Sequence, residues 1–494
     1  MEYKRPLSPP KIKPRLIIHG GAGNIKPTNL TPERYEAVRK SLLGMIAKTH
    51  TYMHAASPPS ALQVATYAVT LLEDDPLFNA GKGAVFTRDG IQQMESSVMM
   101  SRGHAKRAAG ALGLRHVKNP ILLARAILEH GEEDLWGRKG QGHKDSLGFS
   151  DIKSDEDGCL DPADVDVPSA QGHTLVFGAA AESLARKYGL EFAPTSYFYT
   201  QTRWDEHTRA LEREKAGEQH LATWSADEYL PQGTTGAVAL DTDGVVCCAT
   251  STGGLTNKLT GRIGDTPVPG AGYWAEEWDE DGPSPRSSSS SAATFWDRGL
   301  EAVRRPGAVL EFTGVLRGLM ADCLPTPFIY APVAPATSSQ LITTRSFATS
   351  GTGNGDSFLR VNAGRTAAAI ARWKGVPSAQ ALTAVTGPEG ELQKSAGDRW
   401  MITGEGEGGM IGIESIVVRD TDGNIVQAGN SILQDHNCPG MFRAWVDDDD
   451  KAVFQVWHDG SDVSKLGFHG EGRREDVRDW ADEKSGVRGD IYGA

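Results

Sequence analysis

The stretch GTTGAVALDTDGVVCCATSTGG, residues 233–254, places two adjacent threonines between glycines and a second threonine cluster eighteen positions later. A threonine hydroxyl is a poor nucleophile unless a base removes its proton, and no histidine lies in this stretch. One solution makes threonine the first residue of a chain, so that its own α-amine, with a pKa of about 7.7–8.0, is the base. That chemistry requires a backbone cut between Gly233 and Thr234. The alternative is that Thr234 and Thr235 simply begin a strand, because threonine favours β structure.

A hairpin explains the spacing of the two threonine clusters. DTDG between apolar runs predicts a tight turn, with Thr242–Gly244 as a three-residue loop and glycine in the left-handed position. Pairing continued outward from this turn places Thr234 opposite Thr252, with β-carbons about 4.5–5.5 Å apart. A slip of one residue would bring Ser251 opposite Thr234 instead. Both faces of the hairpin carry small or apolar residues, which predicts a central sheet covered on both sides.

The composition of the chain narrows the class of protein. The 494 residues are 39% hydrophobic, enough for a full core, and no apolar run is long enough to cross a bilayer. The amino terminus is basic and proline-rich without the apolar stretch of a secretory signal, so we expect a cytoplasmic protein. The formal charge of −13 argues against nucleic acid or an anionic membrane as a partner, and a small-molecule or peptide substrate fits better. The five cysteines form no paired CxxC motifs, so they indicate neither a disulfide framework nor a zinc site.

Helical and strand patterns alternate around the hairpin. A strand is predicted over residues 15–19 and leads into a glycine loop over residues 20–23. Helices are predicted over residues 31–50, capped at Thr31, over residues 60–74 and over residues 121–130, and short strands over residues 84–87 and 94–100. This order predicts helices and strands mixed within one core.

Three polar segments break this pattern: residues 131–172, 205–232 and about 276–344. The first reads as a solvated excursion and the second as a charged helical connector. The third contains DEDGPSPRSSSSSAA, which is too polar to order in a core, although its later part, AVLEFTGVLRGLM, is apolar enough for a docked helix or strand. A second DTDG at residues 420–423 predicts another hairpin, and VDDDDK at residues 446–451 predicts a charged hairpin turn rather than a protease site.

Residues 233–275 resemble the plant-type L-asparaginase and isoaspartyl peptidase family of N-terminal nucleophile hydrolases. The resemblance rests on GTTGAVA, TSTGG and GRIGDTP in that order, and continues in RLIIHGGAG, PLFNAGKGAVFTRDG, VKNPILLARAIL and SGTGNGD. It implies an α+β fold, the four-layer αββα sandwich of N-terminal nucleophile hydrolases, made as one precursor domain over residues 1–494. The precursor would cleave itself into an α subunit, residues 1–233, and a β subunit, residues 234–494, which contains the low-complexity insertion.

The resemblance also implies roles for four residues around the hairpin. Thr234 would be the nucleophile of both autocleavage and catalysis, and Thr252 would orient it. Arg262 and Asp265, three apart in GRIGD, would hold the carboxylate and the ammonium of an amino-acid substrate. For an isolated Arg-x-x-Asp pattern, an ordinary surface ion pair is the alternative.

Further site residues come from other parts of the resemblance. Thr352 and Gly353 lie in SGTGNGD, which is interpreted as a glycine loop before an alanine-rich helical run, FLRVNAGRTAAAIARW, and they would stabilise a developing oxyanion near a helix amino terminus. Asn79 would lie near the nucleophile, whereas His19 is interpreted as a packed residue at a strand end rather than a catalytic base. A structural sodium ion could be held by backbone oxygens of Leu72, Glu73, Asp75, Phe78, Ala80 and Lys82.

The implied reaction is amide hydrolysis without a catalytic cofactor. The threonine attacks the side-chain carbonyl of asparagine or the β-linked carbonyl of an isoaspartyl peptide, and water then releases aspartate from the acyl-enzyme. Glycosylasparaginase and threonine aspartase are related alternatives; the first is secreted or lysosomal, and the second has no need of Asp265 to read a free α-amine. A catalytically inactive, partner-binding scaffold of the same fold is a further alternative. Family habit suggests αβ heterodimers that pair to (αβ)₂, with no nucleic acid or membrane partner.

Overall fold

Helices and strands are mixed along the computed structural model, as the sequence predicts. The structure describes residues 11–103, 108–136, 167–217, 221–230, 233–280, 341–458 and 463–481. The strands are β1 (Arg15–Gly23), β2 (Met94–Met100), β3 (Ala108–Leu114), β4 (Leu175–Phe177), β5 (Thr235–Leu240), β6 (Val246–Thr252), β7 (Tyr273–Glu280), β8 (Ile342–Gly353), β9 (Gly408–Arg419), β10 (Ile425–His436), β11 (Gly440–Val446), β12 (Lys451–Gln455) and β13 (Arg474–Asp476). The α-helices are α1 (Pro32–Met53), α2 (Ala61–Glu73), α3 (Pro120–Trp136), α4 (Gly178–Lys187), α5 (Thr195–Phe198), α6 (Gln201–Lys215), α9 (Gly355–Val361), α10 (Ala363–Trp373), α11 (Ser378–Thr386) and α12 (Glu391–Lys394). Short 3-10 helices are η1 (Gly81–Gly83), η4 (Gly397–Arg399), η5 (Ser464–Leu466) and η6 (Val477–Trp480).

Within the described residues, the strands form two sheets. The larger has nine strands in the order β13-β12-β11-β1-β5-β6-β2-β3-β4, and the smaller has four in the order β10-β9-β8-β7. The two sheets contact each other through a shared apolar cluster, to which β1 contributes Ile17, β5 contributes Val238 and β9 contributes Ile411 and Ile413. The strands β5 and β6 therefore lie in the middle of the larger sheet and face the smaller one.

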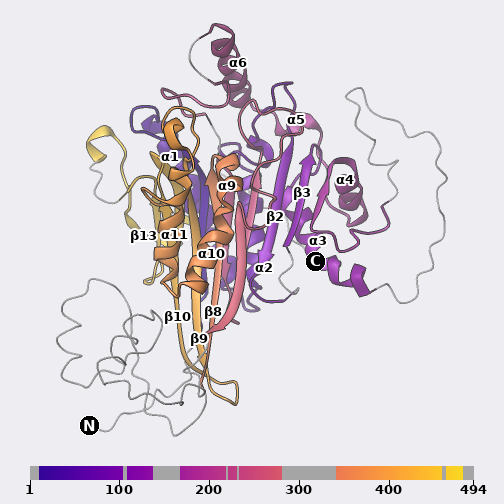
Figure 1. Ribbon diagram of the computed structural model, residues 1–494, viewed down its shortest axis with the longest axis vertical. Coiled ribbons are helices and arrows are strands. Elements are labelled where there is room, and N and C mark those ends of the chain that lie inside the picture. The colour runs from indigo at the N-terminus through magenta and orange to yellow at the C-terminus, as the bar shows by residue number, and fades with distance from the viewer. Residues whose placement is uncertain are drawn as a thin grey trace.

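Helices cover the outer face of each sheet. Buried residues of α1, α2, α3 and α4 form one core cluster with the larger sheet, and buried residues of α10 and α11 form another with the smaller sheet. In Figure 1, α10 and α11 lie in front of β8, β9 and β10, whereas α6 stands at the top of the molecule. The helix starts follow local chemistry, because Thr31 caps α1 and Ser60 closes a capping box at α2.

The register predicted for the first hairpin is confirmed. Thr235 pairs with Ser251, and the pairing runs without a shift to Leu240 and Val246. Gly244 takes a left-handed φ of 83°, as the three-residue loop requires. Both faces are buried: Ala237 lies in the cluster under the helices, and Val238 lies in the cluster between the sheets.

The other hairpin predictions and most predicted elements are also confirmed. Asp420–Gly423 connects β9 to β10, with Gly423 at a φ of 82°, and residues 447–450 connect β11 to β12. The predicted helices over residues 31–50, 60–74 and 121–130 correspond to α1, α2 and α3, and the predicted strand over residues 94–100 is β2. Part of the charged connector is α6, which is helical as expected.

Four local predictions are wrong. Residues 84–87 are not a strand, because they do not pair with a strand of either sheet. Residues 20–23 are not a separate loop but the end of β1. The strand continues through them, with a shift in its pairing to β11 between His19 and Gly21. Ser350–Gly353 is strand rather than loop, paired with β9 through to Gly353. The helical run after it is two helices, since Asn362 takes a left-handed φ of 49° between α9 and α10.

The predicted insertion is shorter than about 276–344. Its first five residues belong to β7 and its last three to β8, and β8 pairs with β7 over the full length of β7. Residues 281–340, including AVLEFTGVLRGLM, lie outside the described residues, as do residues 137–166 of the first polar segment. Cys247, Cys248 and Cys438 are free and buried, and the other two cysteines also lie outside the described part. Among the described helices, none is both long and apolar enough to cross a membrane.

Glu276 on β7 makes a buried ionic anchor for α10. Its carboxylate accepts hydrogen bonds from Arg365 Nη1 at 3.1 Å and Arg372 Nη1 at 2.9 Å, and the side chain is 1% exposed. Glu276→Ala leaves two cations without this partner, and since both arginines are partly exposed we expect a loss of about 2–3 kcal/mol in the free energy of unfolding. Urea-induced unfolding measures the change, with the exposed Glu391→Ala as the control. An unfolding midpoint equal to that of the control would contradict the anchor.

Candidate active site

Three side chains form a row across neighbouring strands of the larger sheet. Thr234 immediately precedes β5, and the confirmed register, continued by one residue, brings it opposite Thr252 at the end of β6. On the far side of β6, Thr252 pairs with Glu95 on β2. All three residues are buried, at 2–3% exposure. The hairpin therefore brings the two threonines together, as the spacing predicts.

The Thr234 hydroxyl has a partner that the sequence did not suggest. Its Oγ1 lies 2.7 Å from Oγ1 of Thr266, a buried residue of the GRIGDTP turn. The Thr252 hydroxyl instead accepts the Gly254 amide at 2.9 Å. The only signal for Thr266 in the sequence was its position next to Asp265, so its contact with the nucleophile candidate is set by the fold.

Gly233, the residue before Thr234, is packed against the backbone of β1. A β-carbon at this position would lie 2.5 Å from Gly21 Cα, 2.6 Å from Ala22 N and 2.8 Å from Thr352 Oγ1. Such distances are too short for any side chain. The Gly233–Thr234 peptide is thus wedged between β1 and the end of β8, which requires glycine at position 233.

Asn79 holds the carbonyl group of that peptide. Its Nδ2 donates to Gly254 O at 2.7 Å and to Gly233 O at 3.3 Å, and its Oδ1 accepts the Val85 amide at 3.0 Å. The bond to Val85 fixes which end of the side-chain amide faces Gly233. A donor on the Gly233 carbonyl is positioned to stabilise negative charge there.

Thr352 and Gly353 lie at the end of β8, and the Thr352 side chain is next to Gly233. Thr352 is fully buried, and its Oγ1 has no hydrogen-bond partner among the described residues. Gly353 has a φ of 138°, and a β-carbon there would lie 2.5 Å from Gly408 Cα on the adjacent strand β9. The following helix, α9, is only seven residues long, so its amino terminus adds little to the site.

His19 is a packed residue, as predicted. It is fully buried, and its Nε2 lies 2.7 Å from Ser350 Oγ. Burial lowers the pKa of His19 to about 3, although a hydrogen bond with the backbone of Thr234 acts in the opposite direction. A neutral imidazole with so low a pKa is a weak base, and its position supports the strand from which Thr234 extends.

The side chains of Arg262 and Asp265 both lie beside Gly355, but they do not form an ion pair with each other. A β-carbon at Gly355 would lie 2.5 Å from Asp265 Oδ1 and 3.0 Å from Arg262 Nη2, so both side chains border this glycine. In the described part of the chain the ion pair of Arg262 is with Asp356, at 3.0 Å. Asp265 Oδ2 and Arg262 Nε have no hydrogen-bond partner among the described residues. The expectation of an ordinary surface ion pair does not fit, because Asp265 is only 5% exposed.

The carboxyl group of Asp265 is electrostatically unusual. Burial raises its pKa to about 7, and the charge of Arg262 only partly opposes this effect. A cation close to the Asp265 carboxyl group would stabilise its ionised form. Arg262 supplies the complementary group, because a guanidinium can bind a carboxylate in a bidentate way.

Glu95, the third member of the row, forms a buried pair with Lys258, and the sequence reasoning missed both residues. Lys258 Nζ is 3.9 Å from Glu95 Oε1, with the two side chains 1% and 2% exposed, and it donates to Gln93 O at 2.9 Å. Glu95 also accepts the Gly264 amide at 3.3 Å, in the turn that carries Arg262. The pair connects the turn to the row of threonines. The sequence offered only that Lys258 lies within residues 233–275, between the TSTGG and GRIGDTP motifs, and that Glu95 lies in a predicted strand.

Comparison with known proteins identifies the family of this chain. The family described as asparaginase matches residues 12–147 and 165–278, just over half of the chain. The chain belongs to the asparaginase family. The match includes Asn79, Thr234, Thr252 and the GRIGD turn, whereas the end of β8 lies beyond it.

Several curated relatives of the asparaginase family are similar to the chain. A putative isoaspartyl peptidase/L-asparaginase of Dictyostelium discoideum is 33% identical over 288 residues, which cover 53% of this chain and 70% of the relative. The isoaspartyl peptidase of Escherichia coli is 34% identical over 260 residues, covering 53% and 67%. A plant-type L-asparaginase of Pyrococcus furiosus is 33% identical over 266 residues, covering 53% and 70%.

The loop expected to hold sodium joins α2 to η1 in this asparaginase-family chain. A β-carbon at Gly81 would overlap the backbone oxygen of Glu73, and one at Gly83 would overlap that of Phe78. Glycine at both positions therefore leaves space in front of these two carbonyl oxygens. The carbonyls of Leu72, Asp75 and Ala80 each accept a hydrogen bond from a nearby backbone amide. Since a carbonyl oxygen has a second lone pair, these five carbonyls fit a hard cation, and the sodium site, with Lys82 as its sixth residue, stays a prediction.

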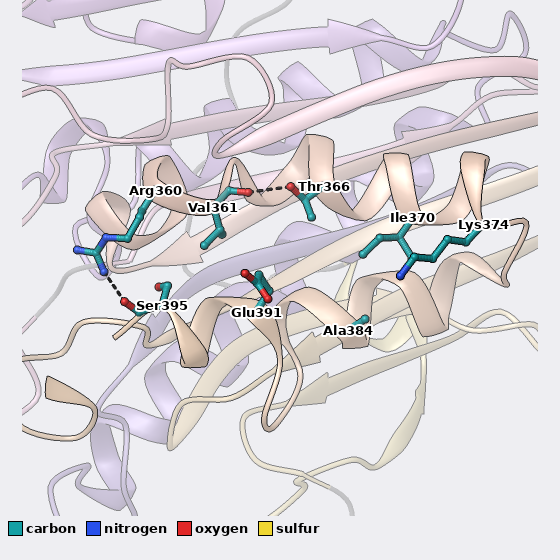
Figure 2. Close-up of a pocket in the computed structure, with 8 residues that line it drawn as sticks. All are labelled: Arg360, Val361, Thr366, Ile370, Lys374, Ala384, Glu391 and Ser395. Atoms are coloured by element: carbon teal, nitrogen blue, oxygen red, sulfur yellow. Dashed lines mark hydrogen bonds between the residues drawn. The ribbon is translucent and has the colours of Figure 1, made fainter. Parts of the chain in front are cut away.

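A surface hollow of about 510 Å³ lies away from the threonine site. Figure 2 shows it between α9 and α10 on one side and α11 and α12 on the other. It is lined by Arg360, Val361, Thr366, Ile370, Lys374, Ala384, Glu391 and Ser395. The polar groups there are engaged locally, since Arg360 donates to Ser395 O and Thr366 to Val361 O. None of the predicted site residues borders this hollow.

The Lys258–Glu95 pair makes a testable contribution to stability. Lys258→Met leaves Glu95 as a buried carboxylate without its cation, and we expect a loss of about 3–5 kcal/mol in the free energy of unfolding. Adding Glu95→Gln removes the stranded charge and should restore part of this loss, which urea-induced unfolding of the two single variants and the double variant measures.

The control is Lys40→Met on α1, because Lys40 forms an exposed ion pair with Glu36. A change within about 0.5 kcal/mol is expected for it. If Lys258→Met were no more damaging than Lys40→Met, or if the two effects at Lys258 and Glu95 simply added, the buried pair would not be coupled.

Proposed function

We propose that this chain is an autoproteolytically activated amidohydrolase that hydrolyses L-asparagine to L-aspartate and ammonia and cleaves β-aspartyl dipeptides. Membership of the asparaginase family makes it a hydrolase of the asparaginase type, and the relatives carry both activities in their names. In this proposal Thr234 becomes the amino-terminal nucleophile of a β subunit, residues 234–494. The α subunit is residues 1–233.

The observation that carries the proposal is the hydrogen bond from Asn79 to the Gly233 carbonyl, beside the buried hydroxyl of Thr234. In the first step Thr234 Oγ1 attacks the Gly233 carbonyl carbon, and its proton passes to the departing Thr234 nitrogen. The Asn79 amide stabilises the oxyanion that forms. Water then hydrolyses the resulting ester, which leaves a carboxylate at Gly233 and a free α-amine at Thr234.

In the mature enzyme the α-amine of Thr234 takes the hydroxyl proton during attack on the substrate carbonyl. The leaving ammonia or amino acid receives a proton, and water releases aspartate from the acyl-enzyme in a second attack. Thr252 lies opposite the nucleophile and orients it, and Thr266 holds its hydroxyl. Thr352 Oγ1, buried without a partner, is available to the oxyanion beside Gly353.

The unpartnered atoms of the site match an amino-acid substrate. Within the described part of the chain these two atoms have no partner, so Asp265 Oδ2 can accept a hydrogen bond from the α-ammonium and Arg262 Nε can donate one to the α-carboxylate. Buried polar groups without partners are rare, and they are expected where a ligand completes the hydrogen bonding. This argument favours a small substrate with both charges over threonine aspartase activity. It also speaks against a catalytically inactive scaffold.

The closed state of the intact chain fits a precursor. Thr234 is 3% exposed, and Tyr229 and Leu230, shortly before the cleavage site, are buried. Trp224 in the same segment donates to Glu407 at 3.2 Å, and Asn24 holds Ser225 O at 2.7 Å. A substrate reaches the nucleophile only when this segment moves, and a cut at Gly233 removes the covalent link that keeps it in place.

The remaining parts of the proposal follow the family. We assign the chain to the αββα sandwich of N-terminal nucleophile hydrolases, as one domain with a low-complexity insertion; the two contacting sheets and their outer helices support this assignment. The αβ units would pair to (αβ)₂ in the cytoplasm, act without a catalytic cofactor, and hold a sodium ion in the loop after α2. Glycosylasparaginase activity is the remaining enzymatic alternative.

Thr234→Ala removes the nucleophile and should leave the chain intact, whereas the unaltered chain should yield two fragments on a denaturing gel. Amino-terminal sequencing of the second fragment should read TTGAVAL, from Thr234. The control Thr235→Ser keeps the hydroxyl that donates to Ser251 O and should cleave normally. A folded, unaltered chain that stays uncut after long incubation would refute the mechanism, as would cleavage of Thr234→Ala.

The raised pKa of Asp265, about 7, predicts how substrate affinity depends on pH. Only the ionised carboxylate attracts the α-ammonium, so binding is complete above this pKa and weakens as the pH falls through it. The inhibition constant of the product L-aspartate should rise about tenfold for each pH unit below 7. Asp265→Asn should bind weakly at every pH, and a pH-independent inhibition constant in the unaltered enzyme would contradict the assignment.

A further inference from the structure

An unusual histidine lies outside the threonine site. His436, the last residue of β10, is 1% exposed, and neither of its ring nitrogens has a hydrogen-bond partner among the described residues. Burial of an imidazole without any partner costs free energy. Buried polar groups of this kind call for an explanation, and an ion is one of the few available.

Two further metal-ligating side chains surround this histidine. The ring of His458 stacks on that of His436, with centroids 3.9 Å apart and an interplanar angle of 3°. Asp435 precedes His436 in the chain, and one ligand atom from each of the three residues lies within 4.8 Å of the others. Thr383 donates to Asp435 Oδ2 at 2.6 Å, which fixes the carboxylate from the other side.

We propose that Asp435, His436 and His458 form a binding site for a divalent transition metal of the zinc type, with a fourth position open to water. Two imidazoles and one carboxylate are a donor set that suits Zn²⁺, whereas Mg²⁺ and Ca²⁺ prefer oxygen ligands alone. The site is separate from the proposed hydrolysis and does not depend on it.

The geometry allows the site to close on an ion. Tetrahedral Zn²⁺ with bonds of about 2.0–2.2 Å holds its ligand atoms roughly 3.3–3.6 Å apart, which is inside the present separation. Parallel stacked rings direct their lone pairs side by side, so one ring must turn. His458 is the exposed member of the pair, and a turn of its ring gives up the stacking on His436 and the hydrogen bond from its Nε2 to His436 O, at 3.0 Å.

The charges around the site are compatible with a cation. Burial, with a contribution from Arg443, lowers the pKa of His436 well below its usual value and keeps the imidazole in the neutral form that binds metals. The Arg443 guanidinium is the cationic group nearby, and it is held by Gln434 and by the carbonyl oxygens of Met441 and Val456. Asp435 supplies the compensating negative charge.

The site joins the two sheets close to the end of β8. His436 lies in the smaller sheet, and His458 follows β12 of the larger one. His436 pairs with Gly409 on β9, and Gly409 pairs on its other side with Thr352. A bound ion would therefore crosslink the sheets two strands away from Thr352.

The test is metal binding to the full chain, prepared without a histidine tag and stripped with EDTA. Titration with Co²⁺ should give one equivalent with the visible absorption of a tetrahedral complex, and Zn²⁺ should displace it and raise the unfolding temperature. Mg²⁺ should do neither. His458→Ala should weaken binding roughly tenfold or more and abolish the rise in unfolding temperature. With metal absent it should unfold at the unaltered temperature, because His458 is exposed.

His469→Ala is the matched control, since His469 is an exposed histidine of the same region and lies outside the cluster. It should bind Co²⁺ as the unaltered chain does. His436→Asn provides a second ligand variant and should also lose the absorption. The proposal is wrong if the unaltered chain binds no Co²⁺ or Zn²⁺, or if His458→Ala binds as tightly as His469→Ala.

Discussion

The pairing of β5 with β6 is the constraint on which the geometry of the site depends. Asp241 fixes the connecting turn, because its Oδ1 accepts the amides of Asp243 and Val245 at 3.0 Å and its Oδ2 accepts the first amide of α2. Side chains alternate along a strand, so a slip of one residue would turn every residue of the hairpin to the opposite face. Since both faces are buried in different clusters, the register is strongly specified, and Thr234 and Thr252 meet as a consequence.

A close approach of Gly233 to β1 adds a second constraint. Gly233 touches the β1 backbone at Gly21, and it lies beside the Thr352 side chain. Glycine is needed on both sides, because a β-carbon at Gly233 would overlap the β1 backbone and because Gly21 has a φ of 123°. The peptide between Gly233 and Thr234 is held from several directions at once, and Asn79 adds a hydrogen bond to its carbonyl. In the proposed autocleavage, this fixation would hold the peptide in place for attack by the neighbouring hydroxyl.

The site also concentrates charge in the interior, which costs free energy. Lys258 and Glu95 compensate each other almost without contact with water, and Asp265 is buried with one oxygen unpaired. The raised pKa of Asp265 reports that cost directly. Interactions in such a water-excluded site are stronger than at the surface, so a substrate that supplies an ammonium to Asp265 and a carboxylate to Arg262 gains more there. The same logic, that a buried polar group needs a partner, singles out His436 on β10, two strands away from Thr352.

The sequence by itself determined the features that depend on a few neighbouring residues. The DTDG turn set the register of β5 and β6, Thr31 marked where α1 begins, and the order of motifs identified the asparaginase family. The strand at residues 84–87 and the loop at Ser350–Gly353 were wrong, because an extended pattern does not say whether a partner strand is adjacent. Only the tertiary structure decided that Thr266, Glu95 and Lys258 belong to the site and that Arg262 pairs with Asp356. Those contacts join segments far apart in the chain, and they depend on the order of strands and on side-chain packing, neither of which local periodicity encodes.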